Sequence, residues 1–320
     1  MDLAVTFLGT GGSVPSARRS TASVLVARGG DRLLFDCGEG TQRQMQRSLG
    51  LVQADEIYLT HYHADHVLGL PGLLKTYDLT DRQVPLTVYG PPGLTELFQI
   101  FGPLVGRLNF PIDLVELGAA DSVAHEGYEV RPFEASHGAR PANGYALVEA
   151  ERPGRFDPAA AAAAGVPEGP AYAALQRGEE VEGEAGVVAP DRVMGPSRPG
   201  RALVVTGDTA PSPATVSAAA DADLLVHDAS FAEEEVQRAA ETGHATVGQA
   251  AAVAAEAHVK LLALVHISSR YHVGKVIEEA REIFEPTVAP KDFDVIELPF
   301  PERGEPKLIP NGAVDQAGAG

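Results

Sequence analysis

Short apolar runs alternate with amphipathic stretches along most of the chain. β-Branched and leucine-rich runs bounded by turn residues are typical of strands, and longer stretches of good helix formers with helical spacing are typical of helices. The predicted strands are residues 3–8, 23–27, 32–36, 56–59, 86–89, 130–135, 202–206, 224–228, 261–266 and 294–298. The predicted helices are residues 41–48, 72–79, 231–242, 247–257 and 273–284. This mixture predicts an α/β protein with layered sheets and helices.

The pattern changes between residues 151 and 200. Proline and glycine are dense in this segment, and six alanines run from Ala159 to Ala164. We expect the segment to contribute little to a core and to contain several turns. Because the alternation of strands and helices resumes after it, we interpret it as an insertion (151–200) into one domain that comprises residues 1–150 and 201–311. The tail, residues 312–320, is predicted to be disordered.

Composition excludes several classes of protein. The 320 residues contain 44% hydrophobic and 22% charged positions, as is ordinary for a globular protein, and no run approaches a membrane span of about 20 apolar residues. The start, Met1-Asp2-Leu3, lacks the features of a secretory signal, so a cytoplasmic location is expected. Cys37 is the only cysteine, which excludes an intrachain disulfide and a thiolate-rich zinc site.

The formal net charge of −19 argues at first against a nucleic-acid partner. The charges are unevenly distributed, however. Residues 1–50 hold six arginines against four acidic residues, a net of +2, whereas residues 201–250 hold two basic against eight acidic residues, a net of −6. We therefore hypothesise a basic face that includes Arg18, Arg19, Arg43 and Arg47, with a second contact from Arg152, Arg155 and Arg177. A solvated acidic surface unrelated to function is the alternative.

The densest group of chemically active residues follows the predicted strand 56–59. Three imidazoles and a carboxylate occur within six residues: His61, His63, Asp65 and His66. Neutral imidazole nitrogen and carboxylate oxygen are the ligands that Zn²⁺ and similar ions prefer. In a tight turn, His61 and His63 can face one point while Asp65 and His66 face an adjacent one. The cluster therefore predicts a metal site.

Three further candidates stand at the ends of other predicted strands: His137, Asp208 and His266. Strand ends that converge at one edge are where an α/β fold builds its site. Each of the histidines taken alone could be a hydrogen-bonded core residue. Together with the cluster, the three give seven ligands, which is enough for two metal ions if one carboxylate bridges them.

The motif Thr60-His61-Tyr62-His63-Ala64-Asp65-His66 resembles that of the metallo-β-lactamase superfamily, and the rest of the chain resembles ribonuclease Z within it. The resembling segments are Phe7-Leu8-Gly9-Thr10-Gly11, Phe35-Asp36-Cys37-Gly38-Glu39-Gly40-Thr41-Gln42, His137 with Gly144-Tyr145, Thr206-Gly207-Asp208-Thr209, Gly165-Val166-Pro167-Glu168-Gly169-Pro170 and His266-Ile267-Ser268-Ser269-Arg270-Tyr271. The resemblance implies a four-layer αββα sandwich with a protruding flexible arm. It also implies an endonuclease that removes the 3′ trailer from precursor tRNA and leaves a 3′-hydroxyl on the tRNA.

Carried over by position, the resemblance implies two divalent metal ions, with Zn²⁺ favoured and Mn²⁺ as the alternative. It assigns the first ion to His61, His63, His137 and Asp208, and the second ion to Asp65, His66, Asp208 and His266. Two such ions suit phosphodiester hydrolysis, because they lower the pKa of water and neutralise the phosphate. Asp65 is also expected to orient or deprotonate the nucleophile.

The resemblance points to His244 as the acid that protonates the leaving 3′-oxygen, with Asp228 as its partner. The family more often has Glu where this chain has Asp228, and Ser where it has Ala245. The shorter carboxylate is expected to weaken the contact.

Substrate contacts are expected from two places. Arg270 and Tyr271 directly follow a ligand, and Gly169 and Pro170 lie in the motif of the arm that grips the tRNA in this family. The resemblance further implies a homodimer in which the arm of one subunit holds a precursor tRNA that the other subunit cleaves.

Two other functions stay open at this point. The first is another phosphodiesterase of the same fold, acting on small or cyclic nucleotides, which would need no arm. The second is a binding protein with a structural metal, which is disfavoured because structural zinc sites are closed by four ligands. A β-lactamase is disfavoured because Cys37 is not at a ligand position.

Overall fold

The computed structural model describes residues 2–311, so the predicted disorder of the tail at 312–320 concerns residues outside the described part. Its contacts divide the chain into a larger unit of residues 1–125, 129–148 and 202–320, and a smaller unit of residues 126–128 and 149–201. The predicted insertion at 151–200 lies within the smaller unit. Within residues 2–311, no helix has the length and apolar character needed to cross a membrane.

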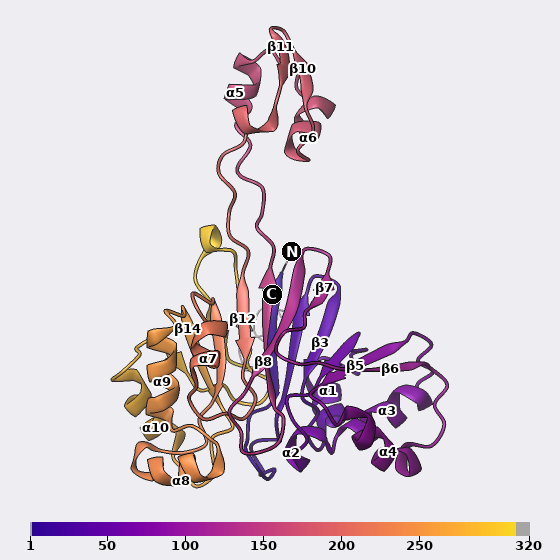
Figure 1. The fold of residues 1–320 in the computed structure, drawn as a ribbon, viewed down its shortest axis with the longest axis vertical. Coiled ribbons are helices and arrows are strands. Elements are labelled where there is room, and N and C mark those ends of the chain that lie inside the picture. Colours follow the sequence, from indigo (N-terminus) through magenta and orange to yellow (C-terminus); the bar gives the residue numbers. More distant parts are fainter. Residues whose placement is uncertain (1, 312–320) are drawn as a thin grey trace, which may run out of the picture. The chain divides into compact units, whose positions relative to one another are not determined.

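The larger unit contains two sheets (Figure 1). In spatial order the first sheet consists of β17 (Lys307–Ile309), β16 (Val295–Glu297), β1 (Leu3–Gly9), β2 (Ser23–Arg28), β3 (Asp31–Phe35), β4 (Glu56–Tyr58), β5 (Leu86–Gly90) and β6 (Ile112–Glu116). The second consists of β15 (Thr287–Val288), β14 (Leu261–Val265), β13 (Leu224–Asp228), β12 (Ala202–Val205), β9 (Asn143–Glu149), β8 (Tyr128–Glu134) and β7 (Val123–His125).

The two sheets pack face to face through aromatic side chains. The Tyr145 ring from β9 lies 5.9 Å from the Phe35 ring and 5.2 Å from the Tyr58 ring, both of the first sheet. The Tyr145 hydroxyl donates a hydrogen bond to the Leu59 carbonyl at 2.8 Å. These contacts fix the strand ends of one sheet against those of the other.

Helices cover both outer faces. The larger unit contains α1 (Thr41–Ser48), α2 (Ala64–Val67), α3 (Leu70–Leu79), α4 (Leu94–Val105), α7 (Pro213–Ala218), α8 (Val236–Thr242), α9 (Val247–Glu256) and α10 (Val273–Arg281), with short 3₁₀ turns η2 (Glu233–Glu235) and η3 (Pro301–Arg303). Helices α1, α3 and α4 pack on the first sheet, and α7, α9 and α10 pack on the second (Figure 1). The four-layer αββα arrangement predicted from the resemblance is confirmed.

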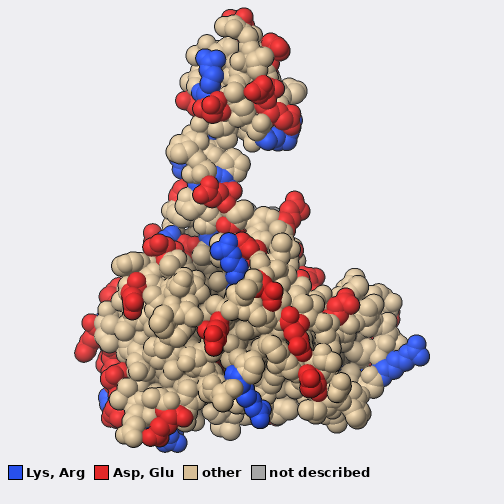
Figure 2. Space-filling model, in the orientation of Figure 1, with Lys and Arg blue, Asp and Glu red and all other residues tan. Residues whose placement is uncertain are grey.

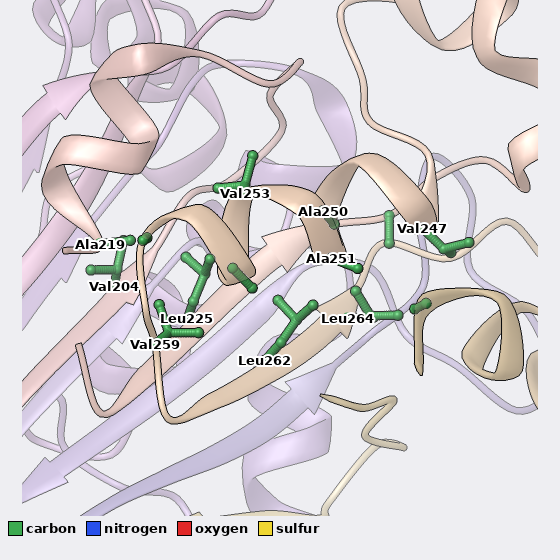
Figure 3. Packing of buried hydrophobic residues seen from close by; sticks show 14 of the residues in the cluster. Val204, Ala219, Leu225, Val247, Ala250, Ala251, Val253, Val259, Leu262 and Leu264 are labelled. Atoms are coloured by element: carbon green, nitrogen blue, oxygen red, sulfur yellow. The ribbon is translucent and has the colours of Figure 1, made fainter. Parts of the chain in front are cut away.

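Helix α9 shows how the second outer layer is held. Thr246 caps it, because the Thr246 hydroxyl accepts a hydrogen bond from the Gln249 backbone amide and the Gln249 side-chain oxygen accepts one from the Thr246 backbone amide. Small residues on its buried face, Ala250 and Ala251, allow close packing over Leu225 and Leu262 of the sheet, as Figure 3 shows. The layer is therefore dry and close to the strand ends that carry the site.

Most predicted elements agree with the observed ones, and one helix is wrong at its start. Residues 231–235 do not continue α8 but form a turn. Phe231 instead pairs with the strand-like segment before α9, since its carbonyl accepts from the Val247 amide at 2.9 Å. Tertiary pairing therefore overrides the local helical propensity of this segment.

The smaller unit has a core of its own, contrary to the expectation that the segment would contribute little to one. It contains α5 (Pro158–Ala163), α6 (Pro170–Gln176), the hairpin β10 (Val181–Gly183) and β11 (Gly186–Val188), and the 3₁₀ turn η1 (Pro190–Arg192). Its hydrophobic core consists of Ala161, Val166, Leu175, Val188 and Val193. The alanine run supplies α5, which Asp157 caps by accepting hydrogen bonds from the Ala159 and Ala160 amides. A small core thus forms where turns alone were expected.

Candidate metal centre

The site residues leave the ends of strands at one edge of the larger unit. His61 follows β4, and His63 caps α2, which carries Asp65 and His66. Strands β12, β13 and β14 run parallel, so the residues after them, including Asp208 and His266, emerge at a common edge. His137 follows β8 of the same sheet. The topology therefore brings together seven side chains from four segments that are far apart in the sequence.

The seven side chains form two groups that share Asp208. His61, His63, His137 and Asp208 form the first group, and Asp65, His66, Asp208 and His266 form the second. In each group one donor atom per residue lies within 4.8 Å of the others. The Oδ2 atom of Asp208 lies 3.7 Å from His61 Nε2, whereas its Oδ1 atom lies 3.3 Å from His66 Nε2. The Asp208 carboxylate thus faces both groups, one oxygen to each.

Four of the histidines are fixed through the ring nitrogen that points away from the centre. The contacts are Thr60 Oγ1 to His61 Nδ1 (3.0 Å), Asp36 Oδ2 to His66 Nδ1 (2.7 Å), the Gly243 carbonyl to His137 Nδ1 (2.7 Å) and Ser230 Oγ to His266 Nδ1 (2.7 Å). Each contact sets the orientation of a ring and directs Nε2 inward, as is usual around metal-binding histidines.

The donor set fits divalent ions. His66 Nε2 is buried and makes no hydrogen bond within the described residues, which is the state expected of an atom meant for a metal. Burial and the neighbouring histidines lower the pKa of His61, so its imidazole is neutral and able to bind a metal. Burial opposes ionisation of Asp208, but the nearby His266 and His66 outweigh it and hold the pKa of Asp208 well below its usual range.

A second pair of side chains adjoins the centre. Asp228 is wholly buried, and its Oδ2 atom lies 2.7 Å from His244 Nδ1. The Ser230 hydroxyl donates to the other carboxylate oxygen at 2.6 Å. Burial alone would lower the pKa of His244, but the hydrogen bond and charge of Asp228 raise it to about 9. Although aspartate is shorter than the glutamate that is common in the family, the Asp228 carboxylate reaches the imidazole. The expected weakening of this contact is not found.

His244 also belongs to a third group of possible metal donors, with Asp208, Asp228 and His266. The His244 ring stacks on the His266 ring, with centroids 5.3 Å apart. The geometry therefore allows two interpretations of His244, as an acid beside the metals or as a ligand.

The residues predicted to contact the substrate belong to two different units of the chain. Arg270 pairs with Glu235, its Nη2 atom lying 3.1 Å from Oε2, and its guanidinium lies 5.3 Å from the Tyr271 ring. Gly169 and Pro170 belong to the smaller unit, where Gly169 precedes α6 with a φ of 117°. Neither pair is among the donors of the centre.

Sequence reasoning missed the residues that orient the ligands. Asp36 binds His66 and also accepts hydrogen bonds from the Thr60 amide and hydroxyl. The Ser13 amide donates to Asp65 Oδ2 at 2.8 Å, which attaches the loop 11–20 to the second group. Asp36 lies in the segment Phe35–Gln42 that resembles the family, so the sequence contained a signal for it. The Ser13 amide belongs to the backbone and gives no such signal.

Known proteins identify the class to which this fold and site belong. Residues 17–249 match the family model described as "Metallo-beta-lactamase superfamily", so the chain is a member of that superfamily. A protein of solved structure from Bacillus subtilis, YhfI, described as a metallo-beta-lactamase fold protein, superposes with a TM-score of 0.68 over 93% of this chain and 100% of its own, at 19% identity. That likeness shows the fold alone.

Closer relatives define the family within that class. The chain is 46% identical to Ribonuclease Z of Methanosarcina acetivorans over 93% of this chain and 99% of the relative. It is 48% identical to Ribonuclease Z of Natronomonas pharaonis over 94% of this chain and 100% of the relative. The crystal structure of the short form of human tRNase Z superposes with a TM-score of 0.65 at 28% identity, covering 92% of this chain and 99% of its own. The chain belongs to the ribonuclease Z family.

Proposed function

We propose that the protein is a metal-dependent endoribonuclease that removes the 3′ trailer from precursor tRNA by phosphodiester hydrolysis and leaves a 3′-hydroxyl on the tRNA. The observation that carries this proposal is the near-complete match to relatives named Ribonuclease Z at 46% and 48% identity. The alternative of a small or cyclic-nucleotide phosphodiesterase has less support. A yeast PDE1 structure shares the fold at only 11% identity.

The two donor groups support two metal ions held by His61, His63, His137, Asp65, His66, His266 and the shared Asp208. Zn²⁺ suits this set of imidazoles and carboxylates, and Mn²⁺ is the alternative. When bound, the ions would supply an activated water and neutralise the charge of the reacting phosphate. The protein's own groups then orient and protonate the reactants.

Asp65 and His244 take the two proton-handling roles. The Asp65 carboxylate, held by the Ser13 amide, orients the nucleophile and accepts its proton. His244 donates a proton to the leaving 3′-oxygen, and Asp228 keeps His244 protonated at neutral pH through the contact at 2.7 Å. The chemistry ends with a hydroxyl on the tRNA and a phosphate on the trailer.

A basic basin supports binding of RNA by this acidic chain. A cavity of about 520 Å³ is lined by Arg18, Arg19, Arg43, Arg47 and Lys291, with Glu39 and Asp292 as its carboxylates. Asp292 accepts hydrogen bonds from Thr10, Ser20 and Gln44, so its charge is engaged by the protein itself. By contrast, carboxylates are scattered over the face shown in Figure 2, with few Lys or Arg among them. We assign the basin to phosphates of the acceptor stem.

The remaining parts of the proposal concern the arm and the assembly. The segment 151–200, with Gly169 and Pro170, is proposed to contact the tRNA away from the cleavage point, and Arg270 and Tyr271 to contact it near the centre. Both assignments rest on the resemblance of these segments to the family motifs. A homodimer stays a prediction from the resemblance, and a cytoplasmic location also stays a prediction.

The experiment that tests the proposal uses the purified protein and a precursor tRNA carrying a 3′ trailer. A chelator-treated sample and an Asp65→Ala variant serve as controls. Cleavage at the acceptor end that is lost in both controls would support the proposal. Intact RNA in all three samples, with hydrolysis of a small phosphodiester by the untreated protein, would favour the alternative.

A further inference from the structure

A cavity of about 350 Å³ opens beside the first donor group. Three of the donors, His61, His63 and His137, form part of its wall, together with Tyr62 and Arg140. Its volume lies within the roughly 300–1,000 Å³ of small-ligand sites. No step of the proposed reaction uses this space. It is therefore available to a part of the substrate beyond the reacting phosphate.

Arg140 lines this cavity and an adjacent one of about 590 Å³, which shares the loop 138–142 with it. The only other charged residue in the two walls, apart from the histidines, is Glu134 in the larger cavity. Arg140 is exposed, and its guanidinium has no hydrogen bond or ion pair within residues 2–311. An unpaired guanidinium that lines two adjoining cavities is suited to bind an anion, and above all a phosphate.

The RNA strand must leave the centre on two sides. On one side lies the loop 11–20, which contacts Asp65 through Ser13 and carries Arg18 and Arg19 of the basic basin. On the other side lies the cavity of Arg140, against His61, His63 and His137. A cavity of about 350 Å³ suits an unpaired nucleotide, which a single strand offers and a paired stem does not. The stem therefore belongs to the basin and the trailer to the cavity.

We propose that the cavity accepts the first trailer nucleotide and that Arg140 binds the phosphate linking the first trailer nucleotide to the second. The walls suit any of the four bases, because Tyr62, Pro92 and Pro141 offer apolar and aromatic surface rather than a set of hydrogen-bond donors matched to one base. The Tyr62 hydroxyl donates to the Pro91 carbonyl, which fixes its ring. This inference rests on the proposed cleavage of precursor tRNA.

Substrates that differ in trailer length test the inference. A trailer of one nucleotide ends in a hydroxyl and lacks the phosphate assigned to Arg140, whereas a trailer of five nucleotides has it. We expect Arg140→Gln to lower kcat/KM about tenfold for the long trailer, as for loss of one hydrogen bond to a charged group. It leaves the one-nucleotide substrate unchanged. The salt dependence of binding for the long trailer becomes shallower by about 0.7 in the log–log slope.

Two further variants sharpen the comparison. Arg140→Lys keeps the charge and restores part of the preference for the long trailer. Arg107→Gln removes an exposed arginine that lines neither cavity, and it leaves both substrates unaffected. Equal losses on both substrates in Arg140→Gln, or no loss on either, would overturn the inference while the wild-type activity left the proposed function intact. A wild-type protein that cut neither substrate would overturn both.

Discussion

The Oδ2 atom of Asp228 lies 2.7 Å from Nδ1 of His244, and the carboxylate is wholly buried. The carboxylate also accepts hydrogen bonds from the Ser230 amide and hydroxyl, and its charge favours the protonated imidazole. The pKa of His244 is raised to about 9 even though burial acts to lower it. His244, to which we assign protonation of the leaving group, therefore carries its proton throughout the neutral pH range.

Asp228→Asn should move the alkaline limb of the pH–rate profile to lower pH. Without the carboxylate, burial remains and the pKa of His244 falls from about 9 toward or below its ordinary 6.5. Because His244 acts in its protonated form, the wild-type rate falls as the pH rises through about 9, and the variant rate falls earlier. Single-turnover cleavage between pH 6 and 10 measures both limbs. Asp223→Asn, which alters a buried carboxylate paired with Lys260, is the matched control, and a limb unmoved by Asp228→Asn would remove Asp228 from this role.

His244→Ala separates the two interpretations of His244. As the acid, its loss lowers turnover by about 10²-fold or more, the usual contribution of general acid catalysis, while the metal content stays unchanged. Metal analysis of the variant beside its kinetics makes the distinction. A fall in bound metal would instead assign His244 to the third donor group with Asp208, Asp228 and His266.

Asp208→Ala should remove more metal than Asp65→Ala. Asp208 faces both donor groups, with one oxygen toward His61 and the other toward His66, whereas Asp65 belongs to the second group only. Metal stoichiometry after dialysis is expected to fall at both sites for Asp208→Ala and at one site for Asp65→Ala. Chelation of the wild type should also lower Tm, since an ion that binds only the folded state stabilises it. Equal stoichiometry in the two variants would contradict a bridging Asp208.

The elements that the sequence predicts best are the buried parallel strands and the helices that cover them. Strand 224–228 is found as predicted, because a strand buried on both faces is a continuous apolar run. Helix α4 (Leu94–Val105) was missed because Pro103 and Gly102 interrupt its pattern. The short strand β7 (Val123–His125) was also missed, since three partly exposed residues carry no periodicity.

The donors of the centre could be predicted because each follows a recognisable strand or motif. The groups that position them could not. Asp36 is thirty residues from His66 in the sequence, and Ser230 is 36 residues from His266, so only the fold shows these contacts. Arg140 is a lone arginine in a Pro/Gly-containing loop, and its importance appears only when the cavity around it is known.

The double variant Arg43→Gln/Arg47→Gln should bind precursor tRNA more weakly, and its affinity should depend less steeply on salt concentration. Both side chains line the basic basin. Within residues 2–311 the Arg47 guanidinium contacts Gln44 and the Phe293 ring but no carboxylate, so its charge is not neutralised. Each lost phosphate contact reduces the slope of log K against log salt by about 1. Binding titrations from low to high salt measure this slope, with Lys307→Gln on β17 as the control. A slope equal to that of the wild type would exclude the basin from RNA binding.

Glu149→Ala should destabilise the protein. Arg201 is only 2% exposed and donates hydrogen bonds to both carboxylate oxygens of Glu149, from Nε to Oε2 and from Nη2 to Oε1, both at 2.8 Å. Removing the glutamate takes a counter-charge away from a buried guanidinium, at a cost of about 3–5 kcal/mol in the free energy of unfolding. Urea unfolding followed by circular dichroism measures the loss. The exposed pair Arg177–Glu179 is the control, because water already screens its charges and Glu179→Ala should leave the stability nearly unchanged.

Replacing residues 151–200 by Asn-Gly should separate RNA binding from the chemistry. Val148 of β9 pairs directly with Ala202 of β12, so Ala150 and the new Asn-Gly form a three-residue hairpin loop between Glu149 and Arg201. We expect the variant to fold, bind metal and hydrolyse a small phosphodiester at the wild-type rate. Its kcat/KM for precursor tRNA should fall roughly 100-fold, the gain that a second linked contact commonly provides. A short acceptor-stem hairpin, which lacks the rest of the tRNA, is the control and should be cleaved equally by both proteins. Undiminished cleavage of precursor tRNA would show that the segment has no part in binding, because the intact chemistry would exclude damage to the centre.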